Sequence, residues 1–388
     1  MASSAHKQQQ QLPNMYGTTA APPPTPSALS TNSQSTTAAT ADALSRLLHR
    51  LPPTLSLPTR RSPASSATTS PPLPLISLSD PNPNDRLLSS ASQLGFFQLT
   101  DHDISSQLAQ SAELESLSLF ALEKDKKESY FPKNWPLGHE VDEEDEGGDV
   151  NGESFCLDSS CSTESTELNL TSLREFTRAM EKVGMKMVEM LASAVGFENP
   201  IGEDPTRICS LMWVSQGLHD MDGDKPVLSG GFYPYVVALQ YQIRQQKYSL
   251  STNSCRVTIS PQVDSILVTL GDVAQVWSNG KLKKVRGRPC LVPGNAKNNN
   301  SQSISMSLLV TLPIESRVSP LIIINNGHEE NDEVEEDDQI HGSSSSVKEK
   351  KKEEENKLMF ESFCFEDYAW RLYHERLLLK DPLDRYRI

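Results

Sequence analysis

Long apolar runs and closely paired cysteines are both missing from this sequence of 388 residues. No apolar stretch approaches the length of a membrane-spanning helix, so we expect no membrane partner. The six cysteines are scattered and no signal peptide precedes them, which indicates reduced thiols in the cytoplasm or nucleus rather than a disulfide framework. Only Cys156 and Cys161 lie close together, and a zinc site would need tighter pairs of ligands.

The sequence also has fewer basic residues than acidic ones. The chain has 36 lysines and arginines against 51 aspartates and glutamates, which gives a net charge of −15. A bulk charge of this sign argues against a nucleic-acid-binding protein, although it leaves room for a local basic patch.

Three segments lack the apolar residues that a packed core requires. Residues 1–72 are rich in Ser, Ala, Thr, Pro and Gln and have no acidic residue before Asp42, which predicts a disordered extension. The same composition is compatible with a plastid transit peptide, and hence with a plastid location. The acidic insertion 140–167 and the acidic, Lys/Glu-rich linker 326–357 are also expected to be disordered.

The rest of the chain has the apolar periodicity of a folded protein. We expect a helical N-terminal region over 73–200, a β core over 201–325 and a C-terminal helix within 358–388. The expected helices are 85–94, 106–123, one that a capping box at Ser172 and Glu175 opens and Gly196 ends, and 365–379. Expected strands include 75–78, 96–99, 206–214, 232–248 and 256–259.

The β core is centred on the stretch from Pro261 to Pro313. It opens with an aliphatic and β-branched run that ends at Gly271. The pair Asn279-Gly280 then separates Val273–Trp277 from Lys281–Arg288, a pattern that predicts an antiparallel hairpin because both turn residues must take a positive φ. Residues 304–312 supply a further strand.

These residues resemble a known family. Asp264-Ser-Ile-Leu-Val-Thr-Leu-Gly-Asp272, followed by Trp277-Ser-Asn-Gly-Lys281, is similar to a segment of the plant 2-oxoglutarate- and Fe(II)-dependent dioxygenases, the group that includes isopenicillin N synthase. Gly95-Phe-Phe-Gln-Leu-Thr-Asp-His102 and Asp381-Pro-Leu-Asp-Arg-Tyr386 are similar to segments near the two ends of that family. The resemblance implies an α+β fold with a mainly β core, a double-stranded β-helix (jelly roll, cupin-like) flanked by N-terminal helices and a C-terminal helix.

The resemblance also implies a site that can be checked residue by residue. The family holds iron with two histidines and one carboxylate, arranged as His-x-Asp on one strand and a distal His on another, and holds 2-oxoglutarate with Arg-x-Ser. In this sequence Tyr233 and Tyr235 occupy the His-x-Asp positions and Gly287 the distal His position. Ser303 and Ser305 occupy the Arg-x-Ser positions, and Trp213 falls where the family has a tyrosine that touches the cosubstrate. All three metal ligands are therefore missing.

The histidines elsewhere in the sequence are poor substitutes for the missing iron ligands. Of the eight, only His328 begins a His-x-carboxylate triplet, and it lies in the acidic linker. His219 and Asp222 precede the Tyr233 segment and are the alternative ligands of a divergent iron site, but their spacing differs from that of the family.

Two interpretations of the substituted positions remain open. Tyr233, Tyr235 and Tyr241 are expected on one strand face, because residues two apart in a strand project together. They either fill the former iron cavity, with their hydroxyls bonded to one another or to water, or line a pocket for an aromatic or anionic ligand.

A basic arm suggests a different class of function. Lys283, Lys284, Arg286 and Arg288 cluster near Pro289, and Arg286-Gly287-Arg288-Pro289 matches the core of an AT-hook, which inserts arginines into the minor groove of A·T-rich DNA. An AT-hook works on an extended flexible segment, however, and these residues fall where a core strand is expected. We therefore favour coincidence, or an anionic protein partner, over DNA.

The sequence thus predicts an inactive dioxygenase-like scaffold or ligand-binding module with no catalytic residue, no metal site and no cofactor. Its partner would be an unidentified protein or small ligand. The alternatives are a divergent oxygenase that uses Fe(II) and 2-oxoglutarate with non-standard ligands, and a protein that binds A·T-rich DNA through the basic arm.

Overall fold

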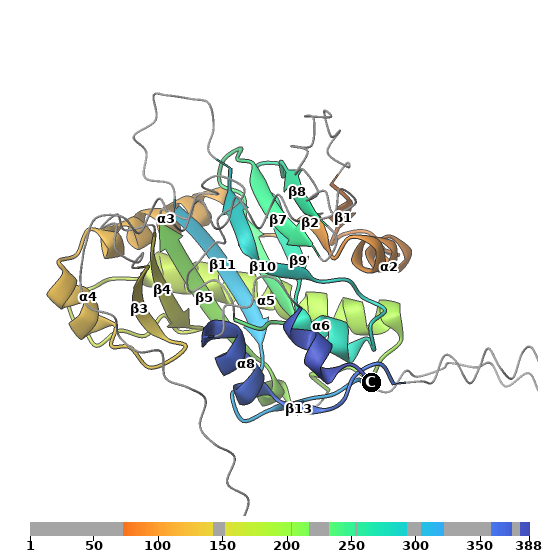
Figure 1. Cartoon of the computed structure of the whole chain (residues 1–388). Coiled ribbons are helices and arrows are strands. Elements are labelled where there is room, and N and C mark those ends of the chain that lie inside the picture. The colour runs from red at the N-terminus through yellow and green to blue at the C-terminus, as the bar shows by residue number, and fades with distance from the viewer. Residues whose placement is uncertain are drawn as a thin grey trace, which may run out of the picture. The chain divides into compact units, whose positions relative to one another are not determined.

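A computed structural model of the chain, drawn in Figure 1, describes residues 73–142, 152–202, 204–216, 233–252, 255–292, 304–321, 358–374 and 381–388. The chain divides into the units 1–68 and 69–388, and the first lies wholly outside the described residues. The extension expected to be disordered at 1–72 and the linker 326–357 fall outside them too. Among the described residues, no helix combines the length and apolarity needed to cross a membrane.

An eight-stranded mixed sheet, which we call the major sheet, forms the centre of the described part. Its strand order is β1-β2-β9-β6-β11-β5-β4-β3. Strand β1 pairs in parallel with β2, and the other pairs are antiparallel. The strands are β1 (Leu75–Ser77), β2 (Phe96–Thr100), β3 (Gly138–Asp142), β4 (Gly152–Asp158), β5 (Cys209–Gln216), β6 (Val237–Tyr241), β9 (Ile266–Leu270) and β11 (Ile304–Thr311).

A three-stranded antiparallel sheet, the minor sheet, has the order β10-β7-β8. Its strands are β7 (Tyr248–Thr252), β8 (Arg256–Ile259) and β10 (Val285–Leu291). Phe96 and Leu267 of the major sheet belong to one buried cluster with Tyr248, Leu250 and Val285 of the minor sheet. The two sheets therefore face each other across an apolar core, as strands with one inward face must do to remove their side chains from water.

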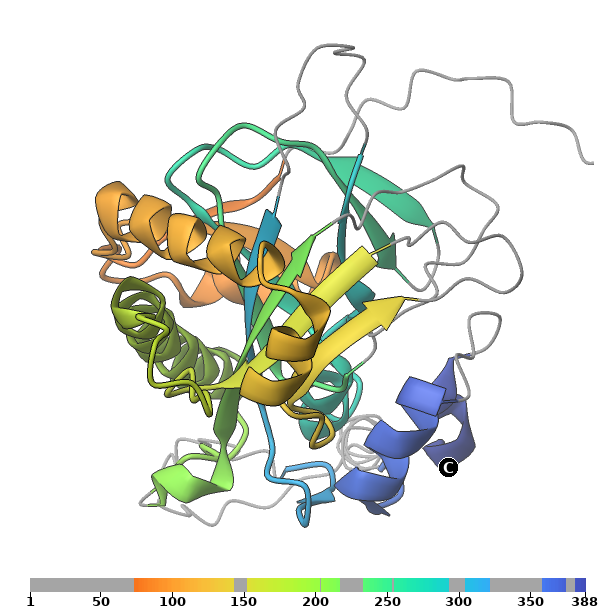
Figure 2. The ribbon, with the colours of Figure 1, turned by 90° about the vertical axis from the view of Figure 1, so that its left-hand side faces the viewer.

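The opposite face of the major sheet is covered by helices. Helix α5 (Thr171–Val195) packs on β6 and β11, and its Gly184 lets the two surfaces approach, since a Cβ there would lie 2.5 Å from Val310 Cγ2. Helices α2 (Asn84–Gln93) and α3 (Ser106–Phe120) pack beside α5, and the short α4 (Lys124–Tyr130) follows α3 (Figure 2). These helices and the strands of the major sheet together supply most of the buried apolar side chains in the larger core cluster.

The C-terminal segments return to the sheet core. Strand β13 (Phe363–Cys364) pairs with β12 (Arg317–Val318), and α8 (Phe365–His374) and the 3₁₀ turn η2 (Pro382–Tyr386) follow it. Another 3₁₀ turn, η1 (Pro205–Arg207), precedes β5. Phe360, Phe363 and Phe365 are buried, so this terminal segment contributes aromatic surface to the core. The α+β architecture with a mainly β core agrees with the fold class expected from the sequence.

The predicted hairpin is wrong, because its first arm is a helix and β10, which contains part of its second arm, pairs with β7 instead. Residues Asp272–Trp277 form the short helix α6, not a strand. Asn279 and Gly280 do take positive φ values of 49° and 83°, but they end that helix, with the Gly280 amide donating to the Gln275 carbonyl at 2.8 Å. The Asn-Gly pair requires a left-handed backbone, which a helix C-terminus provides as readily as a hairpin turn.

The acidic insertion 140–167 also differs from its prediction. Strands β3 and β4 pair as an antiparallel hairpin at the edge of the major sheet, and only residues 143–151 between them lie outside the described residues. Strand β4 contains a short buried apolar run, Phe155, Cys156 and Leu157. The prediction missed this run because the segment as a whole is rich in acidic residues.

The N-terminus of α5 is capped from another helix. Two backbone amides, those of Ser172 and Leu173, donate to the Glu115 carboxylate of α3 at 3.0 and 2.8 Å. The capping box predicted at Ser172 and Glu175 is therefore replaced by a carboxylate from a distant part of the sequence, which satisfies the same unpaired amides.

Candidate functional site

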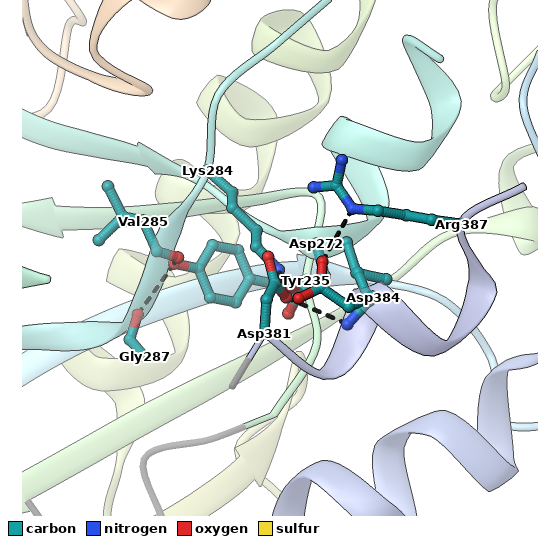
Figure 3. A network of polar contacts seen from close by, with 9 residues as sticks. Tyr235, Asp272, Lys284, Val285, Gly287, Asp381, Asp384 and Arg387 are labelled. Atoms are coloured by element: carbon teal, nitrogen blue, oxygen red, sulfur yellow. Dashed lines mark hydrogen bonds and ion pairs between the residues drawn. The ribbon is translucent and has the colours of Figure 1, made fainter. Parts of the chain in front are cut away.

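Two of the three residues aligned with iron ligands meet inside the fold. Tyr235, just before β6, is 2% exposed, and its hydroxyl donates to the Gly287 carbonyl of β10 at 3.0 Å (Figure 3). The same hydroxyl lies 3.3 Å from Thr269 Oγ1 of β9 and 3.4 Å from the Val285 carbonyl. The Tyr235–Gly287 hydrogen bond thus joins the position aligned with the carboxylate ligand to the position aligned with the distal histidine, and neither of its two groups is charged.

Local backbone geometry creates this contact. The pairing of β10 with β7 shifts register between Arg286 and Cys290, which produces a bulge around Gly287. Gly287 takes φ +70°, a value that glycine adopts without steric cost, and its carbonyl accepts from Tyr235. Gly271 allows the ring to pack closely, because a Cβ there would lie 2.6 Å from the ring atom Cδ2 of Tyr235.

The other two tyrosines lie elsewhere, contrary to the expectation of one shared face. Tyr233 contacts the rings of Trp135 and Phe365, with centroids 5.7 and 5.9 Å away. Tyr241 lies on the helix-covered face, 5.9 Å from the Phe176 ring of α5, and its hydroxyl donates to Asp264 Oδ1 at 3.1 Å. Among the described residues, Tyr235 is therefore the one of these three tyrosines whose hydroxyl bonds to Gly287.

Burial determines the protonation of these tyrosines. It raises the pKa of Tyr235 and of Tyr233 far above the ordinary value for a phenol, and the hydrogen bond to Thr269 offsets only part of the rise at Tyr235. Both side chains are therefore neutral phenols at physiological pH in the metal-free protein.

The aligned cosubstrate position is similarly altered. Ser305 of β11 accepts a hydrogen bond from Gln240 Nε2 at 2.9 Å, and Ser303 lies outside the described residues. Trp213 of β5 projects to the same sheet face as Ser305, and the Arg288 guanidinium carbon lies 4.4 Å from the centroid of its ring. The Arg288 guanidinium is thus stacked on an indole on the sheet face that also carries Ser305.

The basic arm does not form the single surface cluster that the sequence suggested. Lys284 is 1% exposed and binds two carboxylates, those of Asp272 and Asp381, the second at 2.6 Å. Lys283 is exposed, whereas Arg288 stacks on Trp213. Because Arg286–Pro289 belongs to β10, the extended flexible backbone that an AT-hook needs is not available there.

Sequence reasoning missed the role of Lys284, shown in Figure 3 between α6 and η2. Asp272 opens α6, and Asp381 caps η2 by accepting from the Leu383 amide at 3.0 Å. Burial acts to raise the pKa of Asp381, but the charge and hydrogen bond of Lys284 outweigh it and lower that pKa. The sequence did contain one sign of this role: the two aspartates that bind Lys284 lie in motifs that resemble the family, Gly271-Asp272 and Asp381-Pro-Leu-Asp384.

The sequence also gave no indication of a small pocket at the β3–β4 edge. Its walls come from the loop before β3, from β3, β4 and β5, and from α8. Trp135 in this pocket packs against Tyr373 and the exposed Trp370 of α8, with ring centroids 6.0 and 5.5 Å away. The lining residues that bear on chemistry are Lys133, Trp135, Glu140, Ser154, Trp213 and Tyr373.

Among the residues that the structure describes, no set of three or more His, Cys, Asp or Glu side chains could hold a metal ion. The alternative ligands His219 and Asp222, and His328 of the acidic linker, lie outside the described residues.

Comparison with known proteins finds similarity to the same family that the sequence motifs resemble. Residues 73–146 match the family described as non-haem dioxygenase in morphine synthesis N-terminal. Gibberellin 2-beta-dioxygenase 2 of Arabidopsis thaliana is 21% identical over 270 residues, which cover 64% of this chain and 77% of that protein. Gibberellin 2-beta-dioxygenase 1 of Pisum sativum is 20% identical over 272 residues, which cover 64% and 79%.

Solved structures agree at the level of the fold. JOX2 in complex with 2OG, Fe and JA superimposes with a TM-score of 0.57 at 16% identity, over 81% of this chain and 89% of that one. The rice dioxygenase for auxin oxidation gives a TM-score of 0.56 at 16% identity, over 81% and 100%. The double-stranded β-helix expected from the sequence is therefore confirmed as the fold.

Proposed function

We propose that this chain, a 2-oxoglutarate/Fe(II) dioxygenase-like protein in sequence and fold, is a catalytically inactive member of that group that serves as a metal-independent binding module. One observation carries the proposal. The Tyr235 hydroxyl, at the aligned carboxylate position, donates to the Gly287 carbonyl, at the aligned distal histidine position, so each satisfies the other.

The residues present do not fit the iron of the family. A facial triad needs two neutral imidazoles and one carboxylate directed at one point. The aligned positions offer two buried neutral phenols with different neighbours, and a residue without a side chain. Fe(II) would have to displace a buried hydrogen bond and would gain no anionic ligand in return.

Anaerobic titration with Fe(II) and 2-oxoglutarate tests the proposal. An intact site gives a charge-transfer absorption band that requires both components, and we expect none from the full chain. Oxygen consumption and succinate formation, measured in parallel with the same protein, are expected at the level of the buffer. A saturable band, or succinate formed in proportion to enzyme, would overturn the proposal.

The divergent-oxygenase alternative is tested in the same titration. If iron were held by His219 and Asp222, the paired substitutions His219→Ala and Asp222→Ala would abolish the band while Tyr235→Phe would leave it intact. With the inactive module, neither the parent protein nor either variant produces the band.

The compartment is part of the same proposal. All six cysteines are free thiols in the structure, which supports a reducing compartment, the cytoplasm or nucleus, with a plastid as the alternative. Fluorescent fusions at the C-terminus, with and without residues 1–72, would distinguish these locations.

A further inference from the structure

We propose that the outward face of the minor sheet binds a phosphorylated serine or threonine of a protein partner. Two arginines, Arg256 of β8 and Arg286 of β10, would hold the phosphate group. The inference goes beyond the proposed function, because a docking face of this kind would serve an active oxygenase as well as an inactive module. Its test and the iron titration are therefore scored separately.

Strand alternation determines which side chains form this face. Leu250 of β7 and Val285 of β10 belong to the buried cluster between the two sheets. Their neighbours Ser251 and Arg286 therefore project to the opposite, outward face, because successive residues of a strand point to opposite sides. Arg256 pairs with Ser251 and so shares that face. Arg256 is exposed and Arg286 is half-buried.

The register of the sheet places the two arginines on either side of one hydroxyl. Ser251 pairs with Arg286 of β10 and with Arg256 of β8, and we call these three residues the Arg-Ser-Arg row. Neighbouring strands lie about 5 Å apart, so roughly 10 Å separates the two arginine Cα atoms. Two side chains as long as arginine can close that distance above the serine and meet a common anion.

Charge is segregated onto this sheet. Strands β7, β8 and β10 contain three arginines and no acidic residue, in a chain whose net charge is −15. Lys247, which directly precedes β7, is exposed and adds another positive charge. The third arginine, Arg288, stacks on Trp213 and is not part of the row. An acidic protein that collects cations on one sheet presents a local attraction for an anionic group.

The acidic residue Asp381 does not neutralise the row. Burial acts to raise the pKa of Asp381, and the charges of Lys284 and Arg286 lower it. Its carboxylate binds Lys284 Nζ at 2.6 Å, so that lysine supplies the counter-charge. Each guanidinium moreover carries five N–H donors, and a contact within the chain does not use all of them.

A phosphate monoester matches the row better than other anions do. It carries about −1.5 to −2 charges and three acceptor oxygens, which suit two guanidinium forks and one hydroxyl donor. A carboxylate has two oxygens and is satisfied by one fork. Nucleic acids and anionic membranes extend over a larger surface, where the net charge of −15 repels them. A phosphorylated side chain on a peptide brings its charge to the row alone.

Fluorescence anisotropy with the full chain provides the test. The probe is a short fluorescein-labelled peptide of glycine and alanine with one central phosphoserine. The same peptide with serine at the centre, or with glutamate, provides the comparison. We expect saturable binding of the phosphopeptide at low salt that weakens as salt is added, and at least about tenfold weaker binding of the other two peptides.

Variants separate the row from the general charge of the protein. Arg256→Gln and Arg286→Gln should each weaken phosphopeptide binding by about tenfold or more. Arg256→Lys keeps the charge without the fork, so its affinity should lie between those of Arg256→Gln and the parent protein. Arg178→Gln is the matched control, because Arg178 is exposed on α5, on the other side of the major sheet, and this variant should bind like the parent. Melting temperatures verify the fold, and the exposed position 256 keeps the test decisive if Arg286→Gln unfolds.

Any of four outcomes overturns the inference. The first three are no saturable binding of the phosphopeptide at low salt, equal affinity for the serine and phosphoserine peptides, and unchanged affinity in both glutamine variants. The fourth is tighter binding of an A·T-rich duplex or of phosphatidylserine vesicles that the same variants abolish, because the row would then serve a polyanion. None of these outcomes alters the result of the iron titration.

Discussion

At the scale of single residues, the structure shows how a side chain at a metal-ligand position can be retained without a metal. Tyr235 is large enough to cross the barrel to β10, and burial keeps it neutral. Alignment alone could place Tyr235 and Gly287 at corresponding positions, but it could not show that they touch. That contact depends on the bulge in β10, which leaves no clear signature in the sequence.

The Tyr235 hydroxyl should contribute measurably to stability. Tyr235→Phe removes its bond to the Gly287 carbonyl and its contact with Thr269, and we expect a loss of about 1–2 kcal/mol in the free energy of unfolding by urea. Tyr233→Phe is the matched control, because the structure gives its hydroxyl no hydrogen bond among the described residues, and it should lose less. Equal losses from the two variants would contradict the assigned contact.

Lys284 should be far more sensitive to substitution than its neighbour. Lys284→Met leaves Asp272 and Asp381 buried and close together without a counter-charge, which should cost about 3–5 kcal/mol. Lys283→Met, at an exposed position, should stay within about 0.5 kcal/mol of the parent protein. Urea unfolding of both variants at pH 7 measures the difference.

The same buried group of charges predicts a pH dependence. The pKa of Asp381 is lowered in the folded protein, so its contribution to stability is complete above the unfolded value of about 3.9 and is lost as pH falls through the folded value. The parent protein should therefore lose stability below about pH 4. In Lys284→Met the paired aspartates repel each other when charged, so the deficit relative to the parent should shrink as pH falls from 7 to 4. A constant deficit would show that the charges are not coupled.

At the scale of elements, the sequence predicted most strands and helices but not what ends or caps them. Val273–Trp277 was expected as a strand, yet five residues are too few to separate a period of two from one of 3.6, and every residue from Val273 to Trp277 is buried in α6. The Ser172–Glu175 pattern was a plausible cap, but tertiary packing supplied Glu115 instead. Local motifs therefore indicated that a boundary exists without identifying the partner that stabilises it.

The cap from α3 should stabilise α5 more than the predicted capping box does. Glu115→Gln weakens both hydrogen bonds to the first turn of α5 and removes a negative charge from its N-terminus, so we expect a loss of about 1 kcal/mol. Glu175→Gln, on the exposed side of that turn, should change stability by no more than a few tenths of a kcal/mol. Thermal melting of the two variants decides between them, and a larger effect at Glu175 would restore the sequence-based interpretation.

At the scale of the whole molecule, the fold was predictable because apolar strands and family-like motifs extend over most of residues 73–388. That Tyr233, Tyr235 and Gly287 replace the iron ligands of the family stays a prediction from the aligned motifs. The pocket beside Trp213 was not predictable, because its walls come from five segments whose proximity only the folded chain establishes. The sequence therefore indicates individual elements and local motifs, whereas contacts between residues far apart in the chain become known only from the fold.

Restoring the iron ligands should not restore the iron site, because the backbone at position 287 does not suit a histidine and position 233 has other neighbours than position 235. The triple variant Tyr233→His, Tyr235→Asp and Gly287→His supplies every missing side chain, but the bulge holds position 287 at φ +70°, where a non-glycine residue costs about 1–2 kcal/mol. Tyr233 moreover packs against Trp135 and Phe365 and makes no hydrogen bond to Gly287 among the described residues, so a histidine there would lack the contact that joins the other two positions. Metal analysis after anaerobic incubation with Fe(II) should find no more iron than in the parent protein, with circular dichroism used to verify the fold. One equivalent of bound iron in a folded triple variant would mean that the barrel still holds the geometry of a metal site and that only its side chains have been lost.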